Sequence, residues 1–338
     1  MSVRLASAYG GRVRHLLVIT NADAGSSDAD SIEAAVTRLR RDAEVDTAAT
    51  SDLDELRSIL QEVGDREVVI AGGDGSLHAA IACLADLGAF GDHLAAERVG
   101  PAEHAATDTS EVPRPPVLGL IPLGTGNDFA RAVGIPLDPV EAAEALLAHE
   151  PTPVDLIVDD EGHVVVNAVH VGIGADANAK ARPWKAVLGK VGLGALGYGI
   201  GALGAAVSAT GWRLEVVADG EILSDGSTPI LQLGLANGRS VGGGTELAPE
   251  ALPSDGRADL VLSEAVGPLA RLRYGAKMRE GRHTELPDVR LERVRHVRVR
   301  ALEGHFRVNA DGELSDPVTE RTWVVRPGVF LLSHPPMD

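Results

Sequence analysis

The sequence has little cysteine and few aromatic residues, and each shortage narrows the class of protein. Its single cysteine, Cys83, cannot form an internal disulfide or a Cys-rich metal site, which fits a reducing compartment. Cys83 lies among Ala82 and Leu84 and is predicted to be a small core residue. Aromatic residues make up 3% of the 338 residues and hydrophobic residues 44%, so aliphatic side chains must form the cores.

Positive charge is scarce overall but concentrated in one stretch. The chain has 31 Lys and Arg against 49 Asp and Glu, a formal net charge of −18. This argues against a nucleic-acid partner, because duplex binding depends on neutralising phosphates with basic side chains. Residues 271–300 are the exception, with ten basic and four acidic residues, a local charge of +6. The stretch is interpreted as a solvated face, and the alternative is that it orients the protein toward an anionic bilayer.

Long hydrophobic runs are also lacking. The first residues include Arg4, Arg12 and Arg14 without an apolar segment, so no secretory signal is predicted. The longest uncharged run, residues 191–209, contains six glycines and barely reaches the length that spans a bilayer. It is predicted to be a glycine-rich helix or helical hairpin. We therefore expect a cytoplasmic protein, peripheral to a membrane where it meets one.

The length suits two domains. Short apolar segments predict strands at residues 14–20, 45–50, 68–70 and 117–121. Apolar residues at helical spacing lie between the strands, at residues 32–39, 53–63 and 77–84. This alternation predicts an open parallel sheet with helices, in which ligands bind beyond the carboxyl ends of the strands.

The pattern changes after Pro151 and Pro153. Short strand-like runs separated by Gly, Asp and Pro turns follow, which predict an antiparallel sandwich or barrel. We expect an α/β domain at residues 1–150 and an antiparallel β domain at residues 151–317. Residues 318–338, a closing pair of strands or loops, are predicted to return to the first domain.

A glycine-rich loop follows the third predicted strand. Residues 72–76 read Gly-Gly-Asp-Gly-Ser and precede a helical pattern. Glycine lets the backbone approach a ligand closely, and a helix start offers N–H groups to a phosphate. A carboxylate beside phosphate requires a cation, so Asp74 indicates a metal such as Mg²⁺. The alternative is an ordinary strand-to-helix turn with Ser76 as the helix cap.

A second glycine loop follows the next predicted strand. Residues 122–131 read Pro-Leu-Gly-Thr-Gly-Asn-Asp-Phe-Ala-Arg. Thr125 can reach a phosphate, and Asn127 or Asp128 can cap the helix that follows. Two such loops on successive strands of one sheet are expected to face the same crevice.

These two loops resemble the diacylglycerol kinase catalytic family, which includes bacterial soluble lipid kinases and sphingosine kinases. The first loop is shared with NAD kinases, whereas the second is specific to the lipid kinases. The resemblance continues through residues 171–174, 236–239, 242–244, 248–256 and 309–313. It implies an N-terminal α/β domain with an open parallel sheet, a C-terminal antiparallel β-sandwich and an active site in the cleft between them.

The resemblance also implies ATP and Mg²⁺ as cofactors and assigns residues to them. Nucleotide binding falls on Asn21, Ala22, Asp23, Ala24, Gly25, Thr50, Gly72, Gly73, Asp74, Gly75, Ser76, Leu77, His78, Ala79, Thr125 and Asp128. The acidic network around the nucleotide metal falls on Asp74, Asp128 and Asp155. A second, structural Mg²⁺ falls on Leu252, Asp255 and Arg257, with the outer two binding through backbone carbonyls.

The catalytic base is implied to lie in the segment Asp311-Gly312-Glu313. Glu313 is slightly favoured as the base, with Asp311 as metal-linked support. The sequence does not show which of the two acids is the base. The alternative is that the whole segment is only a polar β-turn. His170 and Asn167, on or beside a predicted strand, are interpreted as satisfied structural residues.

Several positions depart from the family pattern. The loop after the first predicted strand, residues 21–26, lacks the proline and the following basic residue that are usual in the family. This is expected to weaken phosphate binding. His78 and Ala79 stand where Asn and Glu are common. The leading prediction is an ATP-dependent kinase for diacylglycerol or a related long-chain alcohol at a membrane surface. An NAD kinase-type enzyme and a non-catalytic regulator are the alternatives. The sequence leaves open the lipid and whether the chain forms a homodimer.

Overall fold

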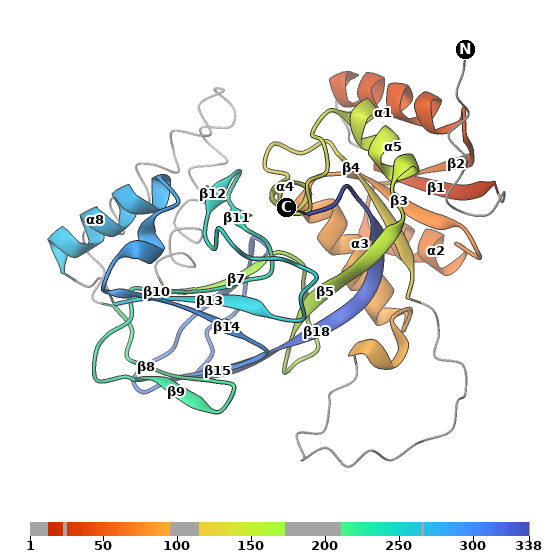
Figure 1. Cartoon of the computed structure of the whole chain (residues 1–338). Coiled ribbons are helices and arrows are strands. Elements are labelled where there is room, and N and C mark those ends of the chain that lie inside the picture. Colours follow the sequence, from red (N-terminus) through yellow and green to blue (C-terminus); the bar gives the residue numbers. More distant parts are fainter. Residues whose placement is uncertain (1–12, 23–25, 95–114, 173–210, 265–266, 338) are drawn as a thin grey trace. The chain divides into compact units, whose positions relative to one another are not determined.

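The computed structural model describes residues 13–22, 26–94, 115–172, 211–264 and 267–337 (Figure 1). The chain divides into unit 1, residues 1–156 and 326–338, and unit 2, residues 157–325. It therefore crosses between the units within two strands, β5 (Pro151–Asp159) and β18 (Glu320–Ser333). The predicted helical segment at residues 191–209 lies outside the described residues.

Unit 1 contains a parallel sheet. Its strands are β1 (Arg14–Asn21), β2 (Ala43–Thr50), β3 (Glu67–Gly72), β4 (Val117–Pro122) and the C-terminal part of β18. Their order is β2-β1-β3-β4-β18, and each neighbouring pair is parallel. The predicted open parallel sheet is confirmed.

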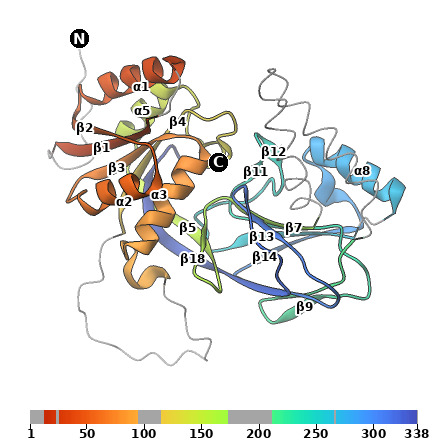
Figure 2. The same cartoon turned by 180° about the vertical axis from the view of Figure 1, so that it is seen from behind.

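Helices cover both faces of this sheet (Figures 1 and 2). The helices are α1 (Ser26–Leu39), α2 (Leu53–Gln61), α3 (Asp74–Asp86), the short α4 (Asp128–Ala132) and α5 (Pro139–Ala148), with a 3₁₀ turn η1 (Gly91–Leu94) after α3. Leu16 and Val18 of β1 pack in one cluster with α1 and α5. Leu17 and Ile19 alternate with them, are equally buried and point to the opposite face. Cys83 is buried in α3, which confirms its prediction as a core residue.

Unit 2 contains an antiparallel β-sandwich. One sheet has the order β14-β13-β10-β7-β16-β17. Its strands are β7 (Ala168–Gly172), β10 (Gln232–Ala236), β13 (Ala258–Ser263), β14 (Val289–Val294), β16 (Val308–Ala310) and β17 (Glu313–Leu314). Opposite it lie β8 (Leu214–Ala218), β9 (Glu221–Asp225), β15 (His296–Ala301) and the N-terminal part of β18. One core joins Val169 and Leu260 of the first sheet to Val299 and Trp323 of the second.

Smaller elements complete unit 2. β6 (Val164–Val165) pairs with β5, and β11 (Ser240–Val241) pairs with β12 (Thr245–Glu246). The helix α8 (Pro268–Arg279) and the 3₁₀ turn η3 (His283–Glu285) pack on the outer face of the six-stranded sheet. Among the described residues, no helix combines the length and the apolar composition needed to cross a membrane.

The C-terminal segment differs from its prediction. Residues 320–333 form the single 14-residue strand β18, where the sequence predicts a closing pair. Gly328 has φ of +63°, which resembles a turn, but its N–H donates to Oδ1 of Asp155 at 2.9 Å. This hydrogen bond to the side chain of Asp155 stabilises the backbone at Gly328, so β18 continues past the irregular residue.

Candidate active site

The carboxyl ends of four parallel strands bring the predicted nucleotide loops to one edge of unit 1. Asn21 and Thr50 are register partners at the ends of β1 and β2, and the N–H of Ala22 donates to the carbonyl of Thr50 at 2.8 Å. The N–H of Leu123 donates to the carbonyl of Gly72 at 3.1 Å, which joins the loops after β3 and β4. Asp23, Ala24 and Gly25 lie outside the described residues.

The two glycine loops touch through their backbones. A Cβ atom on Gly124 would lie 2.8 Å from Cα of Gly73, and one on Gly73 would lie 3.1 Å from Cα of Gly124. Asn127 closes the second loop: its Oδ1 accepts from the N–H of Gly124 at 3.0 Å, and its Nδ2 donates to the carbonyl of Gly124 at 2.7 Å. Thr125 is exposed at the tip. A side chain at either glycine position would separate the two loops, so their contact depends on both glycines.

The helix α3 begins without a side-chain cap. Its N-cap is Gly73, and Ser76 lies within the first turn, so the interpretation of Ser76 as the cap is wrong. The hydroxyl of Ser76 instead covers Gly72, where a Cβ atom would lie 2.5 Å from Oγ. A 13-residue helix without a capping side chain presents its first turn to the loop, which suits an anion.

Asp74 links the two loops. Its Oδ2 accepts from the N–H of Asp128 at 3.0 Å, and its Oδ1 accepts from the N–H of Phe129 at 3.0 Å. The carboxylate therefore caps α4, the helix that follows the second loop. Asp128 is buried beside it, whereas the carboxylate of Asp155 is held by the N–H of Gly328 on β18. Carboxylate oxygens are the ligands that a hard cation such as Mg²⁺ prefers.

The predicted catalytic segment lies in unit 2, and its two acids have different surroundings. Asp311 has φ of 47°. Its carboxylate accepts from the N–H groups of Val166 at 2.6 Å, Asn167 at 2.9 Å and Ala168 at 3.0 Å. Glu313 is exposed at the start of β17. Asp311 therefore holds the backbone between β6 and β7, whereas Glu313 faces solvent.

A buried polar pair adjoins this segment. His170 on β7 is the register partner of Asn309 on β16 and of Gly234 on β10. Nδ1 of His170 and Nδ2 of Asn309 are buried and have no hydrogen-bond partner in the described part of the chain. His170 is therefore not a satisfied structural residue. Burial lowers the pKa of His170 to about 4, although the nearby charge of Asp311 acts in the opposite direction.

At Asp255, the carboxylate of the predicted structural Mg²⁺ site, the guanidinium of Arg293 supplies positive charge. Oδ1 of Asp255 accepts from the N–H of Arg257 at 2.9 Å, and its Oδ2 pairs with Arg293. Asp259, the register partner of Arg293, is buried nearby, and burial raises the pKa of Asp259 to about 6 against the opposing charge of Arg293. The structural Mg²⁺ at Leu252, Asp255 and Arg257 stays a prediction.

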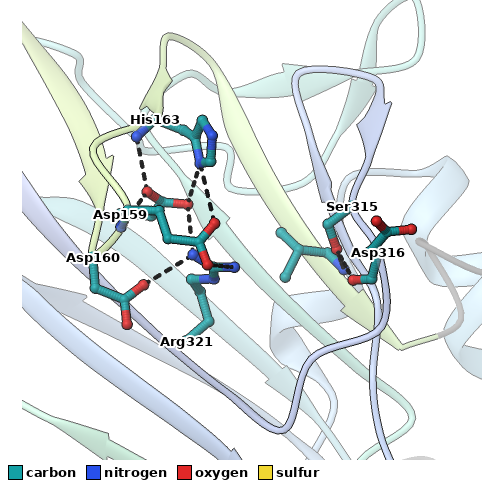
Figure 3. A network of polar contacts seen from close by, with 8 residues as sticks. Asp159, Asp160, His163, Ser315, Asp316 and Arg321 are labelled. Atoms are coloured by element: carbon teal, nitrogen blue, oxygen red, sulfur yellow. Dashed lines mark hydrogen bonds and ion pairs between the residues drawn. The ribbon is translucent and has the colours of Figure 1, made fainter.

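A separate acidic cluster in unit 2 was not singled out from the sequence (Figure 3). Ligand atoms of Asp159, Glu161 and His163 lie within 4.8 Å of one another, which resembles a cation site. However, the buried guanidinium of Arg321 lies 3.3 Å from Asp159, 3.1 Å from Asp160 and 2.9 Å from Glu161. Arg321 pairs with all three carboxylates, so we interpret the cluster as an ion-pair network at the turn between β5 and β6. The sequence holds no motif that joins residues 159–163 to position 321.

Comparison with known proteins identifies the family. The diacylglycerol kinase catalytic domain model matches residues 15–158, and the YegS C-terminal NAD kinase beta sandwich-like domain model matches residues 167–333. A Xanthomonas euvesicatoria protein named "Probable lipid kinase YegS-like" is 30% identical over 329 residues, covering 88% of this chain and 97% of that protein. The chain belongs to the YegS-like lipid kinases. The resemblance to the diacylglycerol kinase catalytic family is thus confirmed.

Other relatives of this YegS-like chain agree. A Pseudomonas aeruginosa protein with the same name is 32% identical over 306 residues, covering 88% of this chain and 87% of that protein. A crystal structure from Bacillus anthracis, described as a diacylglycerol kinase, has a TM-score of 0.70 at 23% identity and covers 96% of this chain and 98% of that one. At this identity the structural likeness shows the fold alone. The Gly72 and Gly124 loops fall inside the first matched domain, and Glu313 inside the second.

Proposed function

We propose that this YegS-like kinase transfers the γ-phosphate of ATP to the hydroxyl of diacylglycerol or a related long-chain lipid alcohol. The observation that supports it most is the backbone contact between Gly73 and Gly124, which Asp74 reinforces by capping α4. This arrangement gathers an uncapped helix start, an exposed threonine and carboxylates at one sheet edge, as a metal-bound triphosphate requires.

In this proposal, the first turn of α3 and the hydroxyl of Thr125 bind phosphate oxygens. Asp74 and Asp128 would hold Mg²⁺, which when bound neutralises charge on the phosphates. Asn21 and Thr50 lie at the same edge on the neighbouring strands and line the remainder of the nucleotide site. The loop at residues 21–26 lacks a basic residue, so α3 and the metal must balance more of the phosphate charge.

Glu313 is the proposed general base. The lipid oxygen attacks the γ-phosphorus, the bond to the bridging oxygen of ADP breaks, and Glu313 takes the hydroxyl proton. Asp311 is poorly suited to this role, because its oxygens already accept three backbone N–H groups. It acts as a positioning residue for the segment that carries Glu313. Base catalysis of this kind contributes about 10²–10⁴ to the rate.

Two isosteric variants test the assignment. The purified chain is incubated with γ-labelled ATP, Mg²⁺ and a panel of diacylglycerol, sphingosine and NAD. Wild type should label the lipid fraction. Glu313→Gln should lower kcat by about 10²–10⁴ while ATP binding and the unfolding free energy stay unchanged. Asp311→Asn should lower the unfolding free energy by about 1–3 kcal/mol, because a neutral amide cannot accept all three N–H groups.

The outcomes separate the alternatives. Label in NAD would support the NAD kinase-type alternative and contradict a lipid acceptor. Nucleotide binding without label in any product would support a non-catalytic regulator. Wild-type turnover in Glu313→Gln, with the fold intact, would remove Glu313 from the reaction.

A further inference from the structure

The helix α8 has two apolar faces, and within the part of unit 2 that the structure describes only one of them packs against other residues. Tyr274 is buried, and Ala270 and Met278 pack beside it on the cluster that covers the six-stranded sheet. On the opposite side, Leu269 is 80% exposed and Leu272 is 62% exposed. These two leucines are three residues apart and therefore share a face of the helix. Large exposed apolar side chains grouped in this way indicate an interaction surface.

The charge of α8 differs from that of the molecule. The helix contains Arg271, Arg273, Lys277 and Arg279 and no acidic residue, whereas the whole chain has a net charge of −18. Within the described residues Arg273 pairs with Asp288 and Lys277 pairs with Glu280, just as Arg298 and Arg300 on β15 pair with Glu215, whereas Arg279 has no acidic partner. The helix α8 contains no acidic residue and therefore places a net positive charge beside the two exposed leucines.

We propose that the outer face of α8, formed by Leu269, Leu272, Arg273 and Arg279, docks on an anionic lipid bilayer. Leucines would enter the interfacial region while the arginines meet lipid phosphates, as in other interfacial helices. A second copy of this chain is a poor partner, because the same positive charges would face one another. The inference rests on the proposed function and deepens it: an acceptor that stays in a bilayer requires the enzyme to sit on its surface. The helix belongs to unit 2, which also carries Glu313.

Vesicle binding of the full chain tests the proposal. Flotation is measured with phosphatidylcholine vesicles and with vesicles that also contain about a third phosphatidylglycerol, at low and high salt. Wild type should bind the anionic vesicles and lose binding as salt rises. The double variant Leu269→Gln/Leu272→Gln should weaken binding at least about tenfold. The matched control is Ile222→Gln on β9, since Ile222 is also 62% exposed, and it should bind like wild type.

A charge variant provides an independent measurement. Arg279→Gln should weaken binding to the anionic vesicles about fivefold, the loss expected for one basic residue near such a surface. Arg41→Gln, which removes an exposed arginine after α1, should change binding less than twofold. Equal losses in the two variants would show that total charge drives adsorption and would overturn the assignment to α8.

Phosphoryl transfer from ATP to a monomeric short-chain diacylglycerol tests the kinase activity independently of membrane docking. The leucine variant should keep wild-type turnover on that soluble acceptor and lose it on vesicle-borne acceptor. Vesicle binding by α8 without any transfer to the soluble acceptor would support docking and contradict the kinase proposal. Unchanged vesicle binding of the leucine variant would overturn docking, as would concentration-dependent dimerisation that the variant abolishes.

Discussion

Two aspartates, one in each unit, each hold a neighbouring stretch of backbone through their carboxylate oxygens. Asp74 accepts N–H groups from the start of α4, and Asp311 accepts three from the backbone before β7. A buried or half-buried carboxylate is well stabilised by backbone donors, which fixes both it and the segment that it holds. In the proposed mechanism the exposed Glu313, and not Asp311, takes the proton from the substrate.

His170 should make the protein sensitive to acid. Its pKa in the folded state is about 4, below the usual 6.5 of the unfolded chain. The unfolded state therefore binds more protons between pH 6.5 and pH 4, and stability is lost as pH falls through that window. Between pH 7 and pH 5 we expect wild type to lose about 2 kcal/mol more unfolding free energy than His170→Gln.

Urea unfolding at the two pH values, followed by tryptophan fluorescence, measures this difference, because Trp212 and Trp323 both lie in unit 2. The control is His305→Gln, which removes an exposed histidine of the same unit. Comparing variants cancels the contribution of Asp259, whose raised pKa of about 6 has the opposite effect on pH dependence. Equal pH dependence of wild type and His170→Gln would contradict the prediction.

At the scale of elements, the proposed nucleotide site depends on two loops that meet through glycine. In both loops a strand ends, a glycine permits close approach and a helix begins, so neither loop is complete without the other. The exposed face of α8 is a different case. Its inner face is fixed by Tyr274, and among the described residues of unit 2 no packing contact requires leucine on the outer face.

Gly124→Ala should separate the two loops. The new Cβ would lie 2.8 Å from Cα of Gly73 and 2.9 Å from Oδ1 of Asn127, and backbone atoms cannot move aside cheaply. We expect the Kd for ATP to rise at least about tenfold, since a strain of about 1–3 kcal/mol falls on the phosphate loops. Calorimetric titration with ATP and Mg²⁺ measures it.

The matched control is Gly275→Ala in α8, where a Cβ would meet no atom within 4 Å. It should leave the Kd unchanged and raise the unfolding free energy by up to about 1 kcal/mol, because alanine is the better helix former. A wild-type Kd in Gly124→Ala would show that the loop contact does not shape the nucleotide site.

At the scale of the molecule, the chain completes its first unit with its last residues. The C-terminal part of β18 pairs in parallel with β4 and places Val329, Phe330 and Leu332 in the core, each fully buried. The sheet of unit 1 therefore contains strands from both the N-terminal and the C-terminal parts of the chain. This long-range pairing also explains why β18 is one strand and not two.

Truncation after Val325 should unfold unit 1. It removes three buried apolar side chains worth about 2 kcal/mol each and leaves β4 as an unpaired edge. We expect hydrogen exchange to lose protection throughout β1–β4 and ATP binding to disappear. A control truncation that removes only residues 336–338 should keep both. Retained protection in the longer truncation would show that unit 1 folds without β18.

Local sequence determined much of this protein. The alternation of strands and helices, the two glycine loops and the position of Cys83 follow from periodicity and from the backbone freedom of glycine, which neighbouring residues already specify. The family motif likewise required no coordinates. These features depend on residues close together in the chain.

Only the tertiary structure decided which residues far apart in the sequence contact or hydrogen-bond to one another. It showed that Gly73 requires glycine at position 124, that Asp311 is occupied by backbone N–H groups from residues 166–168, and that His170 lies unpaired beside Asn309. It also showed which residues of the basic stretch form a helix with an exposed apolar face. These properties arise from strand register and burial between segments far apart in sequence, which local patterns do not encode.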